Sequence, residues 1–565
     1  MDESRSGLER QLVRWPDSFR TRYRAAGAWT DETVPDLLRS AAVAAPRVIG
    51  ASGAAWQLSY AELDRESDRF GAALLELELV PGERVLFQLG NEPETVIAYY
   101  GTIKAGLIPV CSIPQHGERD MVQLARQSGA AAHLVQADYA SQDLQALASK
   151  VAARSGSIRH VVVTRGAARG GHAFDALLET QDPASARRSL MDVAPGPEDV
   201  AVFQLSGGTT GTPKIIPRLH CEYVLNSRQW AHACGLDANS VVMHPIPLIH
   251  NAGIAAAMQP CHAVRGRFVL ASRADPPAVM ELIEKERVQV LPVVPPALLL
   301  RILEHPRRRE YDLSSLTHVI VGGQKLPLEL ADALETELGI ACLQMFGMAE
   351  GMFLRTPDSA PDWVRKHTVG QPISELDEVR ILEPGTERDA AHGAIGELCC
   401  RGPYTIRGYL AAPDHNAQAF TSDGFYRTGD LARAHVLDGE TYYSVEGRLK
   451  DMINRGAEKI NAGEVEEVVV AHPAVEAVAV VAMPDRTLGE RACAYVSLMP
   501  DASVSHEELV AFLLSRGVAK FKLPERLEIV ERLPLTNIGK VDKKSLREDI
   551  ARKVAEEQAT VPVAS

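Results

Sequence analysis

Apolar and polar positions alternate along most of this chain in a way that predicts strands separated by helices. Short apolar runs rich in β-branched residues, such as ERVLFQLG, LIPVCSI and AAHLVQA, predict buried strands. Longer segments with a helical spacing of apolar residues lie between them, for example ETVIAYYGTIKAG and DMVQLARQSG. The alternation recurs further along, with strands predicted at DVAVFQLS, SVVMHPIPLI, GRFVLAS, VQVLPVV and LTHVIVGG and a helix at PAVMELIEKERV. The pattern predicts an α/β fold with largely parallel sheets.

The pattern changes near residue 395, where the predicted strands become short and are punctuated by glycine. IGELCCRG, GETYYSVEGR and DMINRG are typical of hairpin strands and predict a small β unit that follows the large α/β body. Beyond Arg448 the chain carries the apolar runs EAVAVVAMP and RACAYVSLM and the helical segments HEELVAFLLSRG and KKSLREDIARKVAEE. This last part predicts one small α+β domain.

Length, charge and cysteine spacing narrow the class of protein. A chain of 565 residues is too long for one compact domain, so at least two are predicted. The formal net charge is −14, and no cluster of Lys and Arg with interleaved aromatic residues favours a nucleic-acid or membrane partner. The N-terminus MDESRSGLERQLVRWPDSF lacks an apolar core segment, and no uninterrupted apolar run is long enough to span a bilayer, so a cytoplasmic protein is predicted. The eight cysteines form no C-x-x-C pair and predict neither a disulfide framework nor a zinc site.

The stretch LSGGTTGTPK, from Leu205 to Lys214, is the first candidate for chemistry. It lies between an apolar strand and a segment that we predict to be helical, and its small residues would expose backbone N–H groups to an anion. It matches neither the P-loop spacing nor G-x-G-x-x-G. Taken alone, GGTTG is also compatible with an ordinary turn. The residues predicted to bind phosphate are Ser206, Gly207, Gly208, Thr209, Thr210, Gly211, Thr212 and Lys214.

Further motifs extend the pattern over essentially the whole chain. They are FGMAEG (346–351), GELCCRGPYTIRGY (396–409), DGFYRTGDLA (423–432), EGRLKDMINRGAEKI (446–460) and LPLTNIGKVDKKSL (533–546). Together with the phosphate loop, and in this order and spacing, they resemble the adenylate-forming superfamily of acyl- and aryl-CoA synthetases and nonribosomal adenylation domains. Any one motif could arise by chance, whereas six in order are highly specific.

The resemblance implies a reaction in which a carboxylate attacks the α-phosphorus of ATP and releases pyrophosphate, and positioning and positive charge fit that chemistry. It implies that Glu350 holds Mg²⁺, that Asp430 binds the ribose hydroxyls, and that Lys540 is the catalytic cation. The adenine and ribose site implied by the motifs comprises Gly323, Gln344, Met345, Phe346, Asp430, Val445 and Arg448.

The resemblance also implies a division of labour between domains. Residues 1–449 would form the large adenylation domain, and residues 450–565 a small domain that carries Lys540, with a hinge at Lys450. The small domain would present Lys540 for adenylation and then turn for thiol attack, with Gly456 beside the pantetheine arm. A simple surface turn is the alternative interpretation of the segment around Gly456.

The stretch PIPLIHNAGIAAAM bears on which acid is activated. Adenylation domains for α-amino acids usually carry an Asp where this chain has Asn251, so no α-amino group is expected. His250-Asn251, FGMAEG and YRAAGAW are similar to stand-alone aryl acid–AMP ligases of the salicylate and 2,3-dihydroxybenzoate type, in which the Asn bonds an ortho substituent. His250 is interpreted as shaping the pocket, with a core histidine at a strand end as the alternative. The implied aryl pocket comprises His250, Asn251, Ala252, Ala256, Gly322, Gly323, Met345, Ala349 and Phe353.

The chain departs from that subfamily at several pocket positions. Ala252 replaces an aromatic residue, Ala256 replaces a Ser or Cys, and Met345 and Phe353 replace medium aliphatic residues. The loss of a donor at Ala256 disfavours plain 2,3-dihydroxybenzoate. Acids with an ortho-hydroxyl or ortho-amino group and bicyclic heteroaryl acids stay open.

Several functions remain compatible with these motifs. The favoured one is an aryl acid adenylase that loads the phosphopantetheine of a separate aryl carrier protein in nonribosomal peptide or siderophore-type biosynthesis. An aryl-CoA ligase with CoA as acceptor is the main alternative, and the sequence separates the two poorly. Transfer to an amine is a third possibility. A catalytically dead homologue is disfavoured, because it should have lost Lys540, Glu350 or the phosphate loop, and all three are present.

Overall fold

The computed structural model describes residues 7–8, 10–140, 142–206, 213–324, 326–455, 458–485, 487–536 and 540–560. The chain packs as two compact units. The first comprises Met1–Gly207, Thr212–Glu378 and Cys400–Tyr426, and the second comprises Gly208–Gly211, Val379–Cys399 and Arg427–Ser565. The division of labour predicted around residue 449 is taken up below as a proposal.

One sheet of the first unit runs in the order β7-β6-β5-β3-β4-β8-β9. Its neighbouring strands are parallel from β7 to β8, and β9 is antiparallel to β8. The strands are β3 (Arg84–Gln88), β4 (Ile108–Val110), β5 (Ala132–Gln136), β6 (His160–Thr164), β7 (His172–Ala173), β8 (Val200–Leu205) and β9 (Ile215–Leu219).

A second sheet of this unit runs in the order β16-β15-β14-β13-β12-β10-β11-β1-β2. Its central strands from β14 to β1 are parallel, and antiparallel strands flank them. The strands are β1 (Ile49–Ser52), β2 (Gln57–Ser59), β10 (Val241–His244), β11 (Arg267–Leu270), β12 (Val290–Val294), β13 (His318–Val321), β14 (Cys342–Met348), β15 (Gly351–Arg355) and β16 (Gln371–Pro372). Both sheets confirm the predicted α/β fold with largely parallel strands.

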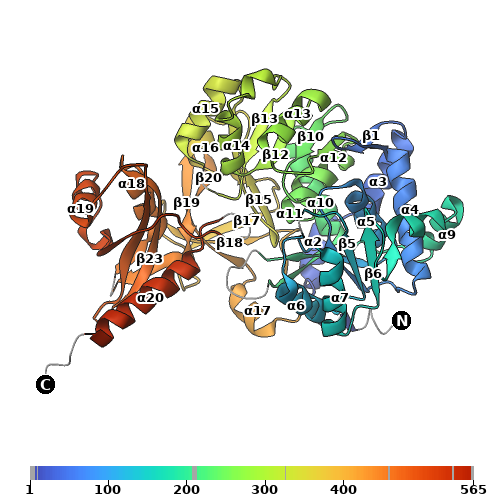
Figure 1. The fold of residues 1–565 in the computed structure, drawn as a ribbon, viewed down its shortest axis with the longest axis horizontal. Coiled ribbons are helices and arrows are strands. Elements are labelled where there is room, and N and C mark those ends of the chain that lie inside the picture. The colour runs from blue at the N-terminus through green and yellow to red at the C-terminus, as the bar shows by residue number, and fades with distance from the viewer. Residues whose placement is uncertain are drawn as a thin grey trace. The chain divides into compact units, whose positions relative to one another are not determined.

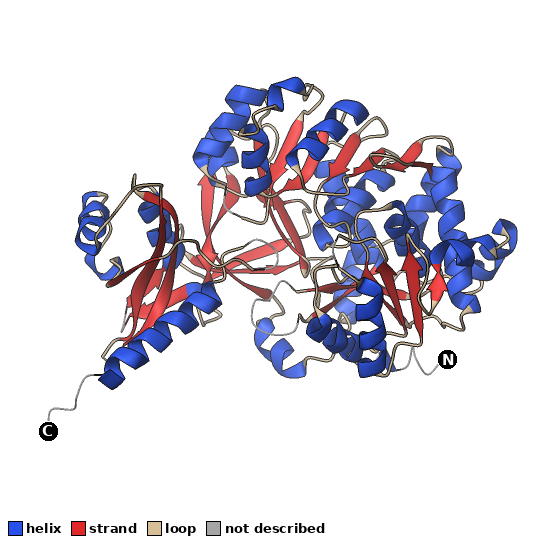
Figure 2. Cartoon of the chain, in the orientation of Figure 1, coloured by secondary structure: helices blue, strands red, loops and turns tan. Residues whose placement is uncertain are grey.

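Helices surround the strands of the first unit (Figures 1 and 2). Those that precede β8 are α2 (Asp17–Ala25), α3 (Val34–Ala44), α4 (Tyr60–Glu76), α5 (Pro93–Lys104), α6 (Glu118–Ser128), α7 (Leu144–Ser155), α8 (Phe174–Glu179) and α9 (Pro183–Met191). Those that follow are α10 (His220–Ala233), α11 (Asn251–Gly253), η1 (Ile254–Met258), α12 (Gln259–Ala263), α13 (Pro276–Glu286), α14 (Pro296–Leu303), η2 (Arg308–Glu310), α15 (Leu328–Leu338), α16 (Asp362–His367) and α17 (Pro413–Ala419). An extended apolar core joins residues from α3, α4, α5, α10 and η1.

Two sequence predictions are wrong in this region. The segment after the phosphate loop begins as strand β9 rather than as a helix, because its β-branched residues pair with β8 and bring Leu205 opposite Ile215. Helix α10 starts only at His220. The strand predicted at SVVMHPIPLI ends at His244, because Pro245 and Pro247 lack the N–H groups that a ladder needs.

The second unit is built from two further sheets and a few helices. One sheet has the order β17-β18-β19-β20, and the other has the order β22-β21-β24-β23 with β25 beside β24. The strands are β17 (Glu378–Leu382), β18 (Gly396–Arg401), β19 (Tyr426–Leu437), β20 (Glu440–Arg448), β21 (Met452–Arg455), β22 (Glu458–Asn461), β23 (Val475–Asp485), β24 (Gly489–Leu498) and β25 (Arg526–Ile529). The helices are η3 (Leu449–Asp451), α18 (Ala462–Val470), α19 (His506–Ser515), η4 (Lys520–Lys522) and α20 (Lys543–Thr560). The predicted small α+β architecture at the C-terminal end is confirmed.

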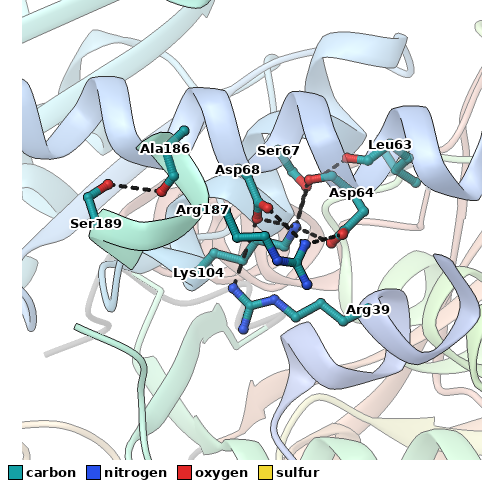
Figure 3. Close-up of polar contacts among 9 residues, drawn as sticks. All are labelled: Arg39, Leu63, Asp64, Ser67, Asp68, Lys104, Ala186, Arg187 and Ser189. Atoms are coloured by element: carbon teal, nitrogen blue, oxygen red, sulfur yellow. Dashed lines mark hydrogen bonds and ion pairs between the residues drawn. The ribbon is translucent and has the colours of Figure 1, made fainter. Parts of the chain in front are cut away.

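A cluster of buried charges links helices of the first unit (Figure 3). Lys104 on α5 is fully buried, and its Nζ lies 2.5 Å from Asp64 Oδ1 and 2.7 Å from Asp68 Oδ1, both on α4. Arg187 on α9 donates to the other oxygens of both carboxylates. Arg39 on α3 approaches Asp68 at 3.9 Å. Each carboxylate therefore has a cation on more than one side, which offsets the cost of burying it.

All eight cysteines are free thiols with buried side chains. Burial raises the pKa of Cys234, Cys342 and Cys493 to about 12. Cys399 and Cys400 are neighbours within strand β18, where successive side chains point to opposite faces. The thiols are placed as core residues, where cysteine packs as a small apolar side chain.

Candidate active site

The phosphate loop leaves β8 and returns on β9, and its two ends are joined. The backbone N–H of Lys214 donates to Ser206 Oγ at 3.0 Å, and the N–H of Ser206 donates to the Lys214 carbonyl at 3.0 Å. The predicted phosphate ligands Gly207, Gly208, Thr209, Thr210, Gly211 and Thr212 lie outside the described residues. The two hydrogen bonds between Ser206 and Lys214 hold the end of β8 next to the residues that lead into β9.

Glu350 lies in the turn between β14 and β15 and is 8% exposed. Its Oε1 accepts a hydrogen bond of 2.7 Å from the Tyr409 hydroxyl, which also lies 2.8 Å from the Tyr426 hydroxyl. The Lys214 ammonium lies 5.6 Å from the centre of the Tyr409 ring. Burial, and then the Glu350 carboxylate, raise the pKa of Tyr409, so the phenol stays a donor. A buried carboxylate and the cation next to the phosphate loop therefore share one neighbour.

A buried arginine holds the turn that carries Glu350 through hydrogen bonds to backbone carbonyls. Arg218, on β9, is fully buried and donates to the carbonyls of Ala349 at 2.7 Å and Tyr404 at 3.0 Å. A Cβ at Gly351, where φ is +126°, would lie 2.2 Å from the Tyr404 carbonyl. Only glycine fits this close approach, which explains the last residue of FGMAEG. Arg218 therefore connects the strand after the phosphate loop to the turn of the carboxylate.

The predicted ortho-substituent ligand Asn251 is buried at the start of α11, with 4% exposure. The Tyr223 hydroxyl, from α10, donates to Asn251 Oδ1 at 2.7 Å, and Asn251 Nδ2 donates to the Met348 carbonyl at 3.4 Å. His250 is exposed rather than a core histidine, and its Nδ1 accepts from the Ala252 N–H at 3.2 Å. The residue that caps this helix is thus His250, which leaves the Asn251 side chain for other contacts.

Apolar side chains surround this region of the first unit. Ala256 is fully buried in η1, a π-helical turn, a feature that is frequent at functional sites. A Cβ at Gly322 would lie 2.7 Å from Met345 Sδ, so Met345 packs directly against that glycine. The Phe353 ring packs edge-on against Trp230, with centroids 5.3 Å apart. Met345 and Phe353 belong to the same buried cluster as Ala256, with the half-buried Ala252 packed against it.

The predicted adenine and ribose residues after β13 and on β14 differ in their exposure. Gly323 is exposed in a left-handed conformation, with φ of +84°. Phe346 is half-buried, and so is Ala349, which was predicted for the aryl pocket. The Gln344 side chain is buried, and its Nε2 donates to the carbonyls of Arg365 and Lys366 at 2.9 Å each. Its amide therefore caps the last turn of α16, and a role toward adenine stays a prediction.

The second unit brings together another group of predicted site residues. Arg448 Nε lies 2.6 Å from Asp430 Oδ1, and the two face each other across the β19–β20 hairpin. Lys540 is half-buried nearby, and its pKa is lowered by burial and by the charges of Arg448 and Lys450, against the opposing effect of Asp430. Arg448, Asp430 and Lys450 therefore all lie close enough to Lys540 to affect its charge. Val445 is half-buried on β20, and Gly456 lies outside the described residues.

Three residues that contact Glu350, its turn or Asn251 are absent from the residues predicted from the sequence. Arg218, Tyr223 and Tyr409 each lie outside or at the end of a motif and read as ordinary surface or core positions. A signal was present for Arg218, since an arginine within the apolar strand IIPRL must find partners when the strand is buried.

The described residues include neither a cluster of metal ligands nor a helix that could span a membrane. Among them, no group of three or more His, Cys, Asp or Glu side chains could hold a metal ion by itself. No helix in the described ranges is long and apolar enough to cross a membrane.

Comparison with known proteins places these features in a family. Residues 39–410 match the model for the AMP-binding enzyme, and residues 464–540 match the AMP-binding enzyme C-terminal domain. The 2,3-dihydroxybenzoate-AMP ligase of Bacillus subtilis is 38% identical over 96% of this chain and 98% of its own length. A salicylyl-CoA synthase / salicylate adenylyltransferase of a Streptomyces species is 38% identical over 96% of this chain and 98% of its length. The apo structure of Mycobacterium smegmatis MbtA has a TM-score of 0.74 and 35% identity, and the match covers 96% of this chain and 99% of that one. The chain is a member of the AMP-binding enzyme family.

Proposed function

We propose that this enzyme activates an aromatic carboxylic acid with ATP and passes the aryl group to a thiol. The observation that carries the proposal is the uncharged Asn251 amide, which is buried in the unit whose apolar core contains Ala256, Met345 and Phe353 and which donates to the Met348 carbonyl. An apolar pocket with one neutral polar group suits an aromatic ring with an ortho substituent and disfavours an ammonium group. The relatives named above act on 2,3-dihydroxybenzoate and salicylate, which agrees with this class of acid.

In the first step, a carboxylate oxygen of the acid forms a bond to the α-phosphorus of ATP. The bond from that phosphorus to the oxygen bridging to the β-phosphate breaks, and pyrophosphate leaves. The step joins two anions, so charge and positioning supply most of the catalysis. Lys214 and the loop that it borders would hold the departing phosphates. Lys540 would bind the carboxylate and α-phosphate, and Asp430 with Arg448 would hold the ribose.

The residues present fit a magnesium ion that is held mainly by the nucleotide. Glu350 is a buried carboxylate that a hydrogen bond from Tyr409 holds in place, and it is the residue that would hold the ion. Mg²⁺ is commonly bound through one or two carboxylates together with substrate phosphates. The ion would neutralise charge on the phosphates, while Arg218 keeps the Glu350 turn in place.

In the second step, a thiol sulfur attacks the acyl carbon, AMP leaves and the thiol proton is released. We propose that the thiol is the phosphopantetheine of a separate aryl carrier protein in siderophore-type biosynthesis in the cytoplasm, with Gly456 beside its path. The Streptomyces relative is named for both CoA ligation and adenylation, so CoA is the second candidate acceptor. Residues 450–565 would turn about Lys450 between the two steps.

The test is a panel of acids assayed for acid-dependent pyrophosphate release. Benzoic, salicylic, hydroxyanthranilic, picolinic and quinoline carboxylic acids are compared, with α-amino acids as the negative class. We expect release with the ortho-substituted aryl acids and none with α-amino acids. Repeating the assay with CoA, and with a phosphopantetheinylated carrier protein, identifies the acceptor by thioester formation. Release with an α-amino acid alone would contradict the proposal.

A further inference from the structure

The hydrogen bonds of Asn251 decide which end of its amide is available to a ligand. Its carbonyl oxygen already accepts from the Tyr223 hydroxyl at 2.7 Å. Its nitrogen donates to the Met348 carbonyl at 3.4 Å, a long contact that uses one of its two N–H groups. Among the described residues this leaves a second N–H of Asn251 for a further acceptor.

The opposite orientation of the amide is disfavoured by its neighbours. Rotation by 180° would place Asn251 Oδ1 against the Met348 carbonyl, and two acceptors would then face each other without a proton between them. The Met348 carbonyl is a fixed reference, because it lies on β14 at the turn that Arg218 and Gly351 hold. The oxygen of Asn251 is therefore directed to Tyr223.

Tyr223 is itself held firmly as a donor. It is fully buried on α10, and the Arg218 guanidinium lies 4.6 Å from the centre of its ring. Burial raises the pKa of Tyr223, so the phenol keeps its proton at working pH. A protonated, fully buried hydroxyl whose ring lies against Arg218 has little freedom to abandon Asn251.

We propose that Tyr223 fixes Asn251 as a hydrogen-bond donor and thereby makes the enzyme select acids whose ortho group is an acceptor. This inference rests on the proposed function, since it requires the aryl acid to lie against Asn251. Tyr223 is then a positioning residue for specificity, because it acts on the acid only through the amide.

The chemistry of the ortho group converts this geometry into a preference. In salicylate the hydroxyl donates an intramolecular hydrogen bond to the neighbouring carboxylate and keeps its proton, and its oxygen remains free to accept from Asn251. In anthranilate the nitrogen lone pair is delocalised into the ring, and the amino group presents N–H where Asn251 also presents N–H. Two donors that face each other in a buried site leave both unpaired, which costs far more than a missing methylene group. Salicylate should be preferred over anthranilate.

The experiment compares kcat/KM for pyrophosphate release with salicylate, anthranilate and benzoate. In the wild type we expect salicylate to exceed anthranilate by about tenfold or more. In Tyr223→Phe, which keeps the ring under Arg218, the amide loses its fixed orientation and the salicylate-to-anthranilate ratio should fall several-fold toward one. Benzoate has no ortho group, so its rate measures general damage to the enzyme.

Tyr99→Phe is the matched control. The Tyr99 hydroxyl is equally buried and accepts a 2.8 Å hydrogen bond from Gln259, so its loss removes a buried phenol whose hydrogen bond is to Gln259 rather than to Asn251. The ratio should be unchanged in that variant. Equal use of both acids by the wild type, or a Tyr223→Phe ratio that matches the wild type, would overturn the proposal. Absence of release with all three acids would overturn the proposed function, and this inference with it.

Discussion

Ala256 belongs to the proposed aryl pocket, where its side chain would meet ring substituents away from the ortho position. It is fully buried in the π-helical turn η1, where the stand-alone aryl acid–AMP ligases that the sequence resembles carry a hydroxyl or a thiol. A methyl group at this position gives an apolar wall that cannot pair with a second hydroxyl on the ring. In the proposed pocket, one missing donor would therefore limit the substrate range.

Ala256→Ser should improve acids that carry a 3-hydroxyl relative to salicylate. The added hydroxyl offers a partner to a group that is otherwise buried and unpaired, a difference of about 1–3 kcal/mol. The measurement is the ratio of kcat/KM for 2,3-dihydroxybenzoate and salicylate in wild type and variant. If both acids change by the same factor, Ala256 is not part of the wall around that position.

Lys540 should give adenylation an alkaline limit that lies below that of an ordinary lysine. Its pKa is lowered by burial and by Arg448 and Lys450, and the charged form is the one that binds anions. The rate should therefore be full below this pKa and fall as pH rises through it. In Lys540→Arg the side chain stays charged over this pH range. The pH profile of kcat/KM for pyrophosphate release should then show no alkaline decrease, although the overall rate should be lower. An unchanged alkaline limb in Lys540→Arg would assign it to another group.

Among the elements, β9 joins the phosphate loop to the Glu350 turn. It follows the loop directly, and its Arg218 donates to the Ala349 and Tyr404 carbonyls while lying 3.7 Å from Glu222. A lysine can donate to both carbonyls only with poorer geometry, because its single ammonium lacks the planar fork of a guanidinium. The strand thus acts as a rigid spacer between the predicted phosphate loop and the Glu350 carboxylate.

Arg218→Lys should raise the KM for MgATP and lower kcat for pyrophosphate release by about tenfold or more, since Glu350 would lose its fixed position. Arg84→Lys is the control. Arg84 lies on β3 and also donates to backbone carbonyls, those of Ser128, Gly82 and Gly129, with no link to Glu350. If both variants show the same loss of activity, the effect of Arg218 is one of general stability.

The helices α4, α5 and α9 owe part of their packing to the charge cluster of Figure 3. Lys104→Met should lower the free energy of unfolding of the first unit by about 3–5 kcal/mol, because Asp64 and Asp68 lose their fully buried partner. The measurement is the midpoint of the corresponding urea transition. Lys150→Met removes a 63% exposed lysine that lies 3.6 Å from Glu118, and should leave the midpoint unchanged. A Lys104→Met midpoint equal to that of wild type would show that the cluster does not stabilise the unit.

The sequence predicts some helices and strands of this fold better than others. The parallel strands follow from apolar runs such as VQVLPVV, because burial on both faces leaves a clear local pattern. The start of β9 was mistaken for helix, because its pairing with β8 depends on a partner across a loop. The roles of Tyr223 and Arg218 escaped prediction for the same reason, since each acts through a contact with a residue distant in the chain.

For the whole molecule, the proposed rotation assigns the two half-reactions to different sets of residues. Lys540→Ala should reduce adenylate formation about a hundredfold or more, while thioester formation from supplied aryl adenylate largely survives. Gly456→Leu should do the reverse, by blocking the thiol while pyrophosphate release stays near wild type. Single-turnover assays of each half-reaction give the comparison. Equal losses in both half-reactions for either variant would contradict a rotation about Lys450.

The buried thiols make such a rotation open to direct observation. Because all eight native cysteines are buried and free, a maleimide dye should find few reactive thiolates on the folded enzyme. Val43 on α3 is 79% exposed and Val470 on α18 is 48% exposed, and they belong to different units. Cysteines introduced at these two positions would accept a donor and an acceptor fluorophore without removal of any native thiol. Energy transfer between them, followed through one catalytic cycle, would then report the motion of single molecules as the acid, ATP and thiol are added in turn.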